Sequence, residues 1–317
     1  MNPCALQETS VRYFLEVVRC GSITEAARRL NVVPSAISKQ IGQLEAGLNT
    51  RLFDRYSRGM IPNAAGELLA KYAFRNQLET ERVNSEILEL QGLKQGEVRL
   101  ACNVGFAFEL VPRAVVKFRQ VHPGIHFHLR EMLSREITSM LCKGEVDIGL
   151  AFSQIPEARL KVEYRDSTPI MAIMHRQHPL AAEPSLTLAQ LARQELGLPS
   201  PGIRTRLALE ACCARQGLVL NTVFSSNSLA PLLAFAHSEG GIVIGFAQLL
   251  HDYLARNDMV AVRLRSRRLL PMNVELQTLA GRVLPQAVIA FLETIQAELL
   301  ASCQSACPSG ALTPPAR

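Results

Sequence analysis

The chain has 317 residues and a formal net charge of +6 at pH 7. Its length exceeds the usual size of a single hydrophobic core, so we expect two or three domains, and its positive charge favours a polyanionic partner. No apolar run reaches the roughly 18 residues of a membrane-spanning helix, and the first residues lack the basic-then-apolar pattern of a signal peptide. We therefore expect a cytoplasmic protein with no membrane partner.

The cysteine spacing indicates neither a zinc site nor a disulfide framework, because the chain contains no Cys-x-x-Cys pair. We expect no metal and no cofactor, and most cysteines should be reduced and buried. A redox sensor at Cys102 or at the adjacent Cys212 and Cys213 is the alternative, although neighbouring helical cysteines point in different directions. The cysteines are at positions 4, 20, 102, 142, 212, 213, 303 and 307.

A first helix is predicted from about Ser10 to Arg19, where apolar residues recur at helical spacing and Gly21 follows the last of them. A second, short helix should begin after Ser22, which can cap it, with Glu25 at the capping-box position. It should end at Asn31, because asparagine tolerates the left-handed conformation of a helix terminus.

A third helix should begin at Pro34, a residue that suits the first helical position. Ile37, Ile41 and Leu44 share one buried face of this helix. Its outer face carries short or polar side chains that can approach a groove of DNA. Two short helices joined by a tight turn are typical of a helix-turn-helix, and three packed helices with a solvated face are the alternative.

Residues 51–55 and 60–62 predict two short strands around the turn at 56–59, which presents Arg55 and Arg58 at its tip. A hairpin wing with arginines suits contact with phosphates or the minor groove. The segment RYFLEVVRCGSITEAARRLNVVPSAISKQIGQLEAGLNTRLFDR, with the later Ala65-Gly66-Glu67, resembles the winged helix-turn-helix of LysR-type transcriptional regulators. The resemblance implies that double-stranded promoter DNA is a partner.

For contact with DNA we expect exposed side chains of the second and third helices and of the wing. Pro34 stands where the family commonly has Gln, so the base preference there is open. Residues 1–63 contain eight Arg or Lys against five Asp or Glu, so affinity depends on where the cations lie. The expected DNA-binding residues are Thr24, Ser35, Ala36, Ser38, Lys39, Gln43, Arg55 and Arg58.

A long helix is predicted over residues 64–92, which contain no proline and follow Asn63 as a cap. Apolar residues fall near a 3.5-residue repeat, interrupted by Asn76 and Glu79. The family resemblance makes this helix the dimerisation linker, and a long surface helix packed on its own protein is the alternative. The repeat consists of Ala65, Leu69, Tyr72, Val83, Ile87 and Leu90.

After a hinge at 93–96, strands alternate with helices, which predicts an α/β architecture with ligands at the carboxyl ends of strands. Strands are expected at 98–102, 125–129, 146–151, 170–174, 195–198, 223–225, 241–244, 259–263 and 274–279. Helices are expected at 110–118, 134–141, 204–216, 228–238 and 285–300.

The resemblance over about 97–300 implies a two-lobed effector-binding domain, similar to periplasmic binding proteins, whose lobes are joined by crossing strands. The domain is expected over 97–302, with lobe I at 97–165 and 268–302 and lobe II at 166–267. Residues 303–317 are expected to be a disordered tail. Family members are dimers or tetramers, so a homodimer or homotetramer is expected.

Loops facing the cleft between the lobes should bind a small-molecule effector, according to the family resemblance. Helix N-termini and Arg204 favour an anion, so an organic carboxylate is the first candidate. Asn103 stands where the family often has Ser or Thr, which implies a different hydrogen-bonding pattern. The expected effector-binding residues are Asn103, Gly105, Met132, Leu133, Ser134, Gly202, Arg204, Thr205 and Asn227, and polar loop or cap roles are the alternative.

The hypothesis is thus a transcriptional regulator and not an enzyme, in which an effector alters the binding of promoter DNA. The rival is a small-molecule-binding protein or enzyme whose N-terminal helices only dimerise it. No Gly-x-Ser-x-Gly elbow, phosphate-binding loop or His-Glu-x-x-His motif is present, which argues weakly against catalysis. A metal site at His126 and His128, with His122 nearby, is conceivable, but a solvated strand face explains these residues better.

Overall fold

The computed structural model describes residues 8–56, 59–90, 96–152 and 156–305. The chain divides into two compact units, which are described separately below. The first comprises residues 1–95 with 281–286, and the second comprises residues 96–280 with 287–317. Within the described residues, no helix is both long enough and apolar enough to cross a membrane.

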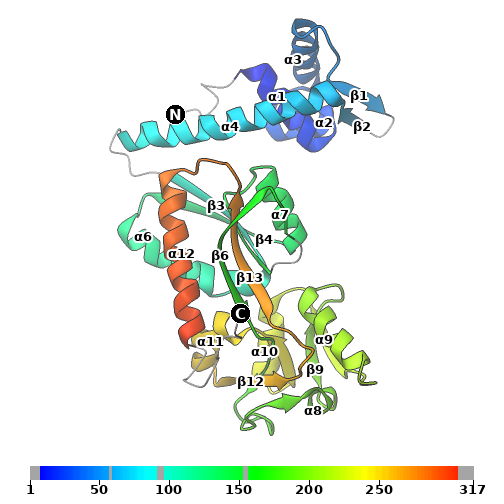
Figure 1. Ribbon diagram of the computed structural model, residues 1–317, viewed down its shortest axis with the longest axis vertical. Helices are drawn as coiled ribbons and strands as arrows, with labels where there is room; N and C mark the ends of the chain where they lie inside the picture. Colours follow the sequence, from blue (N-terminus) through cyan, green and yellow to red (C-terminus); the bar gives the residue numbers. More distant parts are fainter. Residues whose placement is uncertain (1–7, 57–58, 91–95, 153–155, 306–317) are drawn as a thin grey trace, which may run out of the picture. The chain divides into compact units, whose positions relative to one another are not determined.

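The first unit is a winged helix-turn-helix followed by a long helix (Figure 1). Both predicted ends of α2 are confirmed. At its start, Ser22 Oγ accepts a hydrogen bond from Glu25 N at 3.4 Å, and at its end Asn31 has the left-handed conformation with φ 54°. The Glu25 carboxylate instead binds Arg28 and Arg29. The elements are α1 (Thr9–Cys20), α2 (Ile23–Leu30), α3 (Pro34–Gly47), β1 (Phe53–Tyr56), β2 (Gly59–Pro62) and α4 (Ala64–Leu90).

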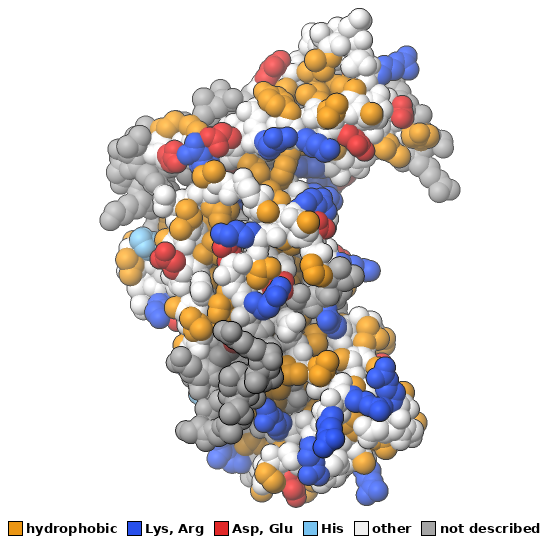
Figure 2. Space-filling model, viewed as in Figure 1, with side chains coloured by type: hydrophobic (Ala, Val, Ile, Leu, Met, Phe, Trp, Pro, Cys, Tyr) orange, Lys and Arg blue, Asp and Glu red, His pale blue; other side chains and the backbone are white. Residues whose placement is uncertain are grey.

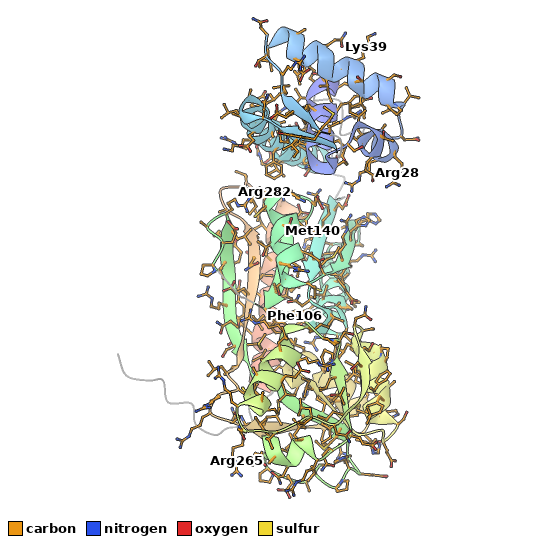
Figure 3. The ribbon with its side chains drawn as sticks, turned by 90° about the vertical axis from the view of Figure 1, so that its right-hand side faces the viewer. Arg28, Lys39, Phe106, Met140, Arg265 and Arg282 are labelled. Atoms are coloured by element: carbon orange, nitrogen blue, oxygen red, sulfur yellow. The ribbon has the colours of Figure 1, made fainter. Side chains whose placement is uncertain are left out.

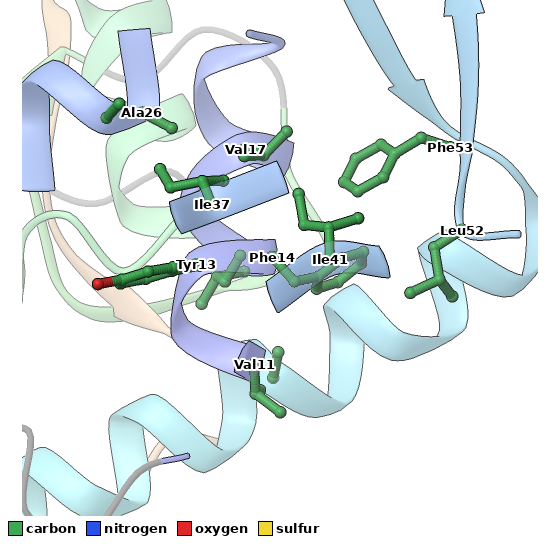
Figure 4. Close-up of a cluster of buried hydrophobic side chains, with 12 residues drawn as sticks. Val11, Tyr13, Phe14, Val17, Ala26, Ile37, Ile41, Leu52 and Phe53 are labelled. Carbon is green, nitrogen blue, oxygen red and sulfur yellow. The ribbon is translucent and has the colours of Figure 1, made fainter. Parts of the chain in front are cut away.

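One apolar cluster holds the three short helices and the wing together (Figure 4). Phe14 of α1 and Ile37 of α3 are fully buried, and the Phe14 ring lies 5.2 Å from that of Phe53 in the wing. Burying each such side chain contributes about 1.5 to 3 kcal/mol. The predicted inner face of α3 is thus confirmed at Ile37 and Ile41.

The wing is fixed to the start of α4 by the backbone around Asn63. Asn63 Nδ2 donates to Arg51 O at 2.9 Å, and Asn63 N donates to Leu52 O at 3.0 Å. Asn63 Oδ1 accepts from Gly66 N at 2.9 Å, which confirms Asn63 as the predicted cap. These bonds bring the first turn of α4 against the Leu52 backbone. The contact at position 66 is so close that only a glycine, which has no Cβ, can occupy it.

Helix α4 runs from Ala64 to Leu90, close to its predicted span. Its predicted seam is wrong at Ala65 and Leu69, which pack against the core of their own unit. Tyr72 of the predicted seam is 58% exposed, and Leu68, four residues before it and outside that seam, is 68% exposed. The apolar spacing alone could not separate the face that packs on the helix-turn-helix from the face left open.

Lobe I of the second unit is a five-stranded sheet in the order β4-β3-β5-β13-β6, with α6 and α12 packed together and α7 against the strands (Figure 1). Rings of Phe118 in α6, Phe127 in β4 and Phe291 in α12 lie 4.7 to 5.8 Å apart. The elements are β3 (Gly96–Cys102), α5 (Val104–Ala107), α6 (Leu110–Val121), β4 (Ile125–Glu131), α7 (Ser134–Cys142), β5 (Ile148–Phe152), β6 (Leu160–Thr168), β13 (Met272–Leu279) and α12 (Gln286–Ser305).

Lobe II is a six-stranded mixed sheet in the order β10-β9-β11-β7-β12-β8. An apolar cluster joins Ile173 and Val243 of the sheet to Leu233 of α10 and Leu254 of α11. The elements are β7 (Met171–His175), β8 (Leu186–Thr187), α8 (Leu188–Ala192), β9 (Leu196–Pro199), α9 (Arg204–Ala214), β10 (Thr222–Ser226), α10 (Leu229–His237), β11 (Ile242–Gly245), a 3-10 turn η2 (Ala247–Leu249), α11 (His251–Arg256) and β12 (Met259–Arg265).

The chain crosses between the two lobes from β6 to β7 and back from β12 to β13, as the family resemblance implied. The nine-residue strand β6 was not predicted, and β13 pairs antiparallel with it. The predicted tail was wrong at its start, because α12 continues to Ser305, while residues 306–317 lie outside the described residues.

An ionic network also joins the lobes, centred on Arg113 of α6. Its Nε donates to Glu298 of α12 at 2.7 Å, and its Nη2 donates to Ser302 Oγ at 2.9 Å. Its Nη1 lies 3.2 Å from Asp252 and 3.3 Å from Glu109. The Glu109 carboxylate accepts from the backbone N of Asp252 at the start of α11, so α6, α11 and α12 share one set of charges.

Candidate functional site

The outer face of α3 is open to solvent. Ser35, Ser38, Lys39 and Gln43 are all exposed, as expected for a helix that enters a groove of DNA. Figure 3 labels Lys39 on this helix. Ala36 was expected on this face, but it is half-buried and packs against the core of the unit.

The positive charge near α3 is distributed unevenly. On α2, Arg28 lies 2.6 Å from Glu25 and Arg29 lies 3.4 Å from Glu16, so both cations are paired within the unit. Lys39 has no acidic partner among the residues that the structure describes. An unpaired exposed lysine on the recognition face can meet a phosphate or a guanine.

Of the remaining residues predicted to contact DNA, the structure describes the side chain of Thr24 but not those of Arg55 and Arg58. Thr24 is exposed in the first turn of α2. Arg58 and the side chain of Arg55 lie outside the described residues. Sequence reasoning did not name Val33, which is 62% exposed directly before α3. A large apolar side chain directly before the helix was the signal that could have identified it.

A cavity of about 1180 Å³ lies between the two lobes of the second unit. Its lobe I wall follows the carboxyl ends of β3, β4 and β5, and its lobe II wall includes the starts of α9 and α10. The cavity brings together every residue that was expected to bind an effector: Asn103, Gly105, Met132, Leu133, Ser134, Gly202, Arg204, Thr205 and Asn227.

Asn103 is tied into the protein by its own side chain. Its Oδ1 accepts from Phe152 N at 2.8 Å and from Ser134 Oγ at 3.0 Å, while its Nδ2 donates to Met132 O at 2.9 Å. The residue is only 8% exposed. Asn103 therefore fastens the ends of β3, β4 and β5 to one another, and only one N–H of its amide is left for a ligand.

The lobe II wall carries the positive charge of the cavity. No side chain caps α9, whose N-cap residue is Ile203. Arg204 in its first turn has no hydrogen-bonding or acidic partner among the described residues, and burial lowers its pKa. Thr205 is 7% exposed, and its hydroxyl bonds to none of the residues the structure describes. Open backbone N–H groups, a guanidinium and a hydroxyl at one helix start form a site for an anion.

An apolar surface completes the cavity. The rings of Phe152 from lobe I and Phe246 from lobe II lie 4.4 Å apart, and Leu232 and Ile244 line the same space. Sequence reasoning missed both phenylalanines, together with Arg135. Phe152 ends β5 and Phe246 directly follows β11, so the rule that ligands meet the carboxyl ends of strands could have identified them.

The buried cysteines are poorly suited to redox chemistry. Burial raises the pKa of Cys102 to about 12 and that of Cys213 to about 11. Both thiols are thus protonated at neutral pH, and the thiolate is the reactive form. Among the described residues, no group of three or more His, Cys, Asp or Glu side chains could hold a metal ion. His128 is exposed and lies 3.5 Å from Glu97.

Two family models match the chain. The model described as "Bacterial regulatory helix-turn-helix protein, lysR family" matches residues 9–67, and the model described as "LysR substrate binding domain" matches residues 91–300. Among curated relatives, the HTH-type transcriptional activator CmpR of Synechocystis sp. is 29% identical over 217 residues, which cover 68% of this chain and 70% of that protein.

Solved structures share the fold along most of the chain. A full-length OxyR variant from Pseudomonas aeruginosa has a TM-score of 0.63 at 18% identity, covering 92% of this chain and 93% of that one. Full-length CbnR complexed with its target DNA has a TM-score of 0.54 at 20% identity, covering 91% of this chain and 98% of that one.

Proposed function

The chain belongs to the LysR family of transcriptional regulators, and we propose that α3 reads promoter DNA while the cavity between the lobes binds an organic carboxylate with an apolar body. The observation that carries the effector proposal is Arg204, which has no partner among the described residues and lies at the uncapped start of α9, in the cavity that Phe152 and Phe246 also line. The DNA proposal is supported by the exposed polar face of α3, and it places the protein in the cytoplasm.

The charges of the cavity favour an anion on the lobe II side. A carboxylate at the first turn of α9 would accept from backbone N–H groups and from the guanidinium of Arg204, and Thr205 could donate a further hydrogen bond. The α7 and α10 helices also begin at the cavity wall, which adds two further positive dipole ends.

The lobe I side selects a different chemical group. Ser134 gives its proton to Asn103, so the Ser134 oxygen can only accept from a ligand. Glu131 also lines the cavity and is an acceptor when ionised. We therefore infer that the ligand carries a hydroxyl or amine donor at the end opposite its carboxylate, with its apolar body against the phenylalanine rings.

A thermal-shift experiment on the full chain tests the effector proposal. A panel of aliphatic and aromatic carboxylates, with their neutral amides as controls, should contain acids that stabilise the protein by about 2.7 kcal/mol at 100 times their dissociation constant. We expect Arg204→Ala to weaken the binding of such an acid by about 2 kcal/mol, or roughly thirtyfold.

Arg215→Ala is the matched control, because Arg215 is exposed at the far end of α9 and does not line the cavity. It should leave the affinity unchanged. A carboxylate site at α9 would be ruled out if amides bind as well as acids, or if both arginine variants respond alike.

Gel shift of promoter fragments tests the DNA proposal. We expect Lys39→Ala to weaken binding about tenfold and to reduce the salt dependence of log K by about 0.9 for each lost phosphate contact. Lys71→Ala removes an exposed lysine of α4 instead of α3 and should change both quantities little. Equal effects of the two variants would remove α3 from the interface.

We also propose that the protein acts as a homodimer or homotetramer. The exposed Leu68 and Tyr72 give α4 an uncovered apolar stripe, which supports pairing through this helix. Two copies would present two α3 helices to the two half-sites of an operator, which is how short recognition helices reach useful specificity.

A further inference from the structure

Lobe II carries a net positive charge that comes entirely from arginines. Residues 169–271 contain ten arginines, no lysine and six acidic residues, so this lobe carries an excess of four positive charges out of the chain's net +6. One of the arginines, Arg204, lines the cavity, and Arg206 donates to the backbone oxygen of Pro199, which also lines it. In Figure 2, blue side chains gather over the lower part of the view, where Figure 1 draws β12 and α9.

Four of these arginines lie within six residues, and we name Arg263, Arg265, Arg267 and Arg268 the β12 arginine cluster. All four are exposed, and none has an acidic partner or a side-chain hydrogen bond among the described residues. Other arginines of the same unit are paired, as Arg165 is with Glu275 at 2.6 Å, or stand singly, as Arg193, Arg215 and Arg256 do, so the close grouping is what sets the cluster apart.

The backbone presents the cluster in a fixed arrangement. Val262 and Leu264 of β12 are buried, so Arg263 and Arg265 share the opposite face about 7 Å apart. Ser266 Oγ accepts from Arg268 N and Leu269 N at 3.3 Å each, which holds the following turn. Arg265 projects outward at the edge of the lobe (Figure 3).

The chemistry of the cluster fits phosphates better than a folded protein partner. Guanidinium groups bind phosphate oxygens with two parallel hydrogen bonds, and four unpaired cations repel one another unless a polyanion neutralises them. Protein interfaces have apolar or aromatic residues at their centre. Among residues 263–270, all of which the structure describes, Leu270 is the one exposed large apolar side chain, at 71%.

We propose that the β12 arginine cluster is a second, sequence-independent contact of this regulator with the phosphate backbone of DNA. It rests on the proposed DNA-binding function and adds to it a contact made by the effector-binding unit. Each phosphate that the cluster neutralises releases counterions, so the contact strengthens binding at low salt without reading any base.

The test uses the full chain and random-sequence duplexes of 20 and 60 base pairs, with log K measured against log of the salt concentration. We expect the triple variant Arg265→Gln, Arg267→Gln and Arg268→Gln to reduce the slope on the longer duplex by about 2 to 3. The matched triple Arg193→Gln, Arg215→Gln and Arg256→Gln removes three exposed charges from the same lobe outside the cluster and should change the slope much less.

The proposal is overturned if both triples reduce the slope equally, since general charge would then explain the effect. It is also overturned if the cluster triple leaves the DNA slope unchanged and weakens binding of polyglutamate, which would make the cluster a site for an acidic protein. Measuring Lys39→Ala on a promoter duplex tests the DNA-binding function of α3 separately from the β12 arginine cluster. If Lys39→Ala does not weaken binding, the function proposed for α3 is contradicted, whichever result the two triple variants give.

Discussion

Gly66→Ala should lower the free energy of unfolding of the winged helix-turn-helix by about 3 kcal/mol. A Cβ on Gly66 would lie 2.1 Å from Leu52 O and 3.0 Å from the Cβ of Pro62. Leu52 O is a backbone atom that already accepts from Asn63 N, so it cannot move without separating the wing from α4. Denaturant unfolding followed by circular dichroism measures the loss, and promoter affinity should fall with it.

Gly42→Ala provides the matched control for Gly66→Ala. Gly42 is exposed in the interior of α3, and a Cβ there would meet no atom within 4 Å. Alanine is the better helix former, so this variant should be as stable as the wild type or more stable by up to about 1 kcal/mol. Similar losses in the two variants would show that crowding against Leu52 O is not the cause.

Arg113→Met should destabilise the effector-binding unit by about 3 kcal/mol at neutral pH. The substitution leaves the Glu298 side chain, which is 9% exposed, with Lys117 alone at 3.0 Å, and it leaves Glu109 and Asp252 without their shared cation. Thermal melting of the full chain measures the change. Glu298→Gln keeps an oxygen that can accept from Arg113 and should cost less.

The pH dependence distinguishes the ionic network from simple packing. Burial alone would raise the pKa of Glu298, but the hydrogen bonds from Lys117 and Arg113 and their charges lower it overall. A lowered carboxyl pKa stabilises the folded state above the unfolded pKa, and this stability is lost as the pH falls through the folded value. The difference in the free energy of unfolding between wild type and Arg113→Met should therefore become smaller as the pH falls. If the variant lost only packing contacts, this difference would stay the same at low pH.

Local signals were sufficient for the DNA-binding unit. Ser22, Asn31 and Pro34 mark helix ends through their own backbone preferences, so α2 and α3 were predicted closely. Strand β6 was missed because its sequence is largely polar and its partner β13 lies more than a hundred residues away in the chain. Pairing with a distant strand overrides weak local preference.

The sequence predicted the location of the cavity more accurately than the function of each residue that lines it. Strand-end and helix-start positions brought the expected residues to one space, because the α/β topology puts those ends together. Asn103 was expected to meet a ligand, but three of its hydrogen bonds go to the protein. An apolar strand end such as Phe152 looks like core in the sequence, so its place on the cavity wall needed the structure.

Asn103 holds three strand ends together by hydrogen bonds, and this lowers the conformational entropy that lobe I loses when a ligand binds. A loop that is already ordered loses little conformational entropy when a ligand arrives, so binding against lobe I requires little free energy for ordering. The Met132 to Ser134 segment is therefore a preorganised surface, whereas none of the residues that the structure describes fixes the guanidinium of Arg204. Differences in affinity among related acids should consequently arise mainly from how each one orders the Arg204 side chain.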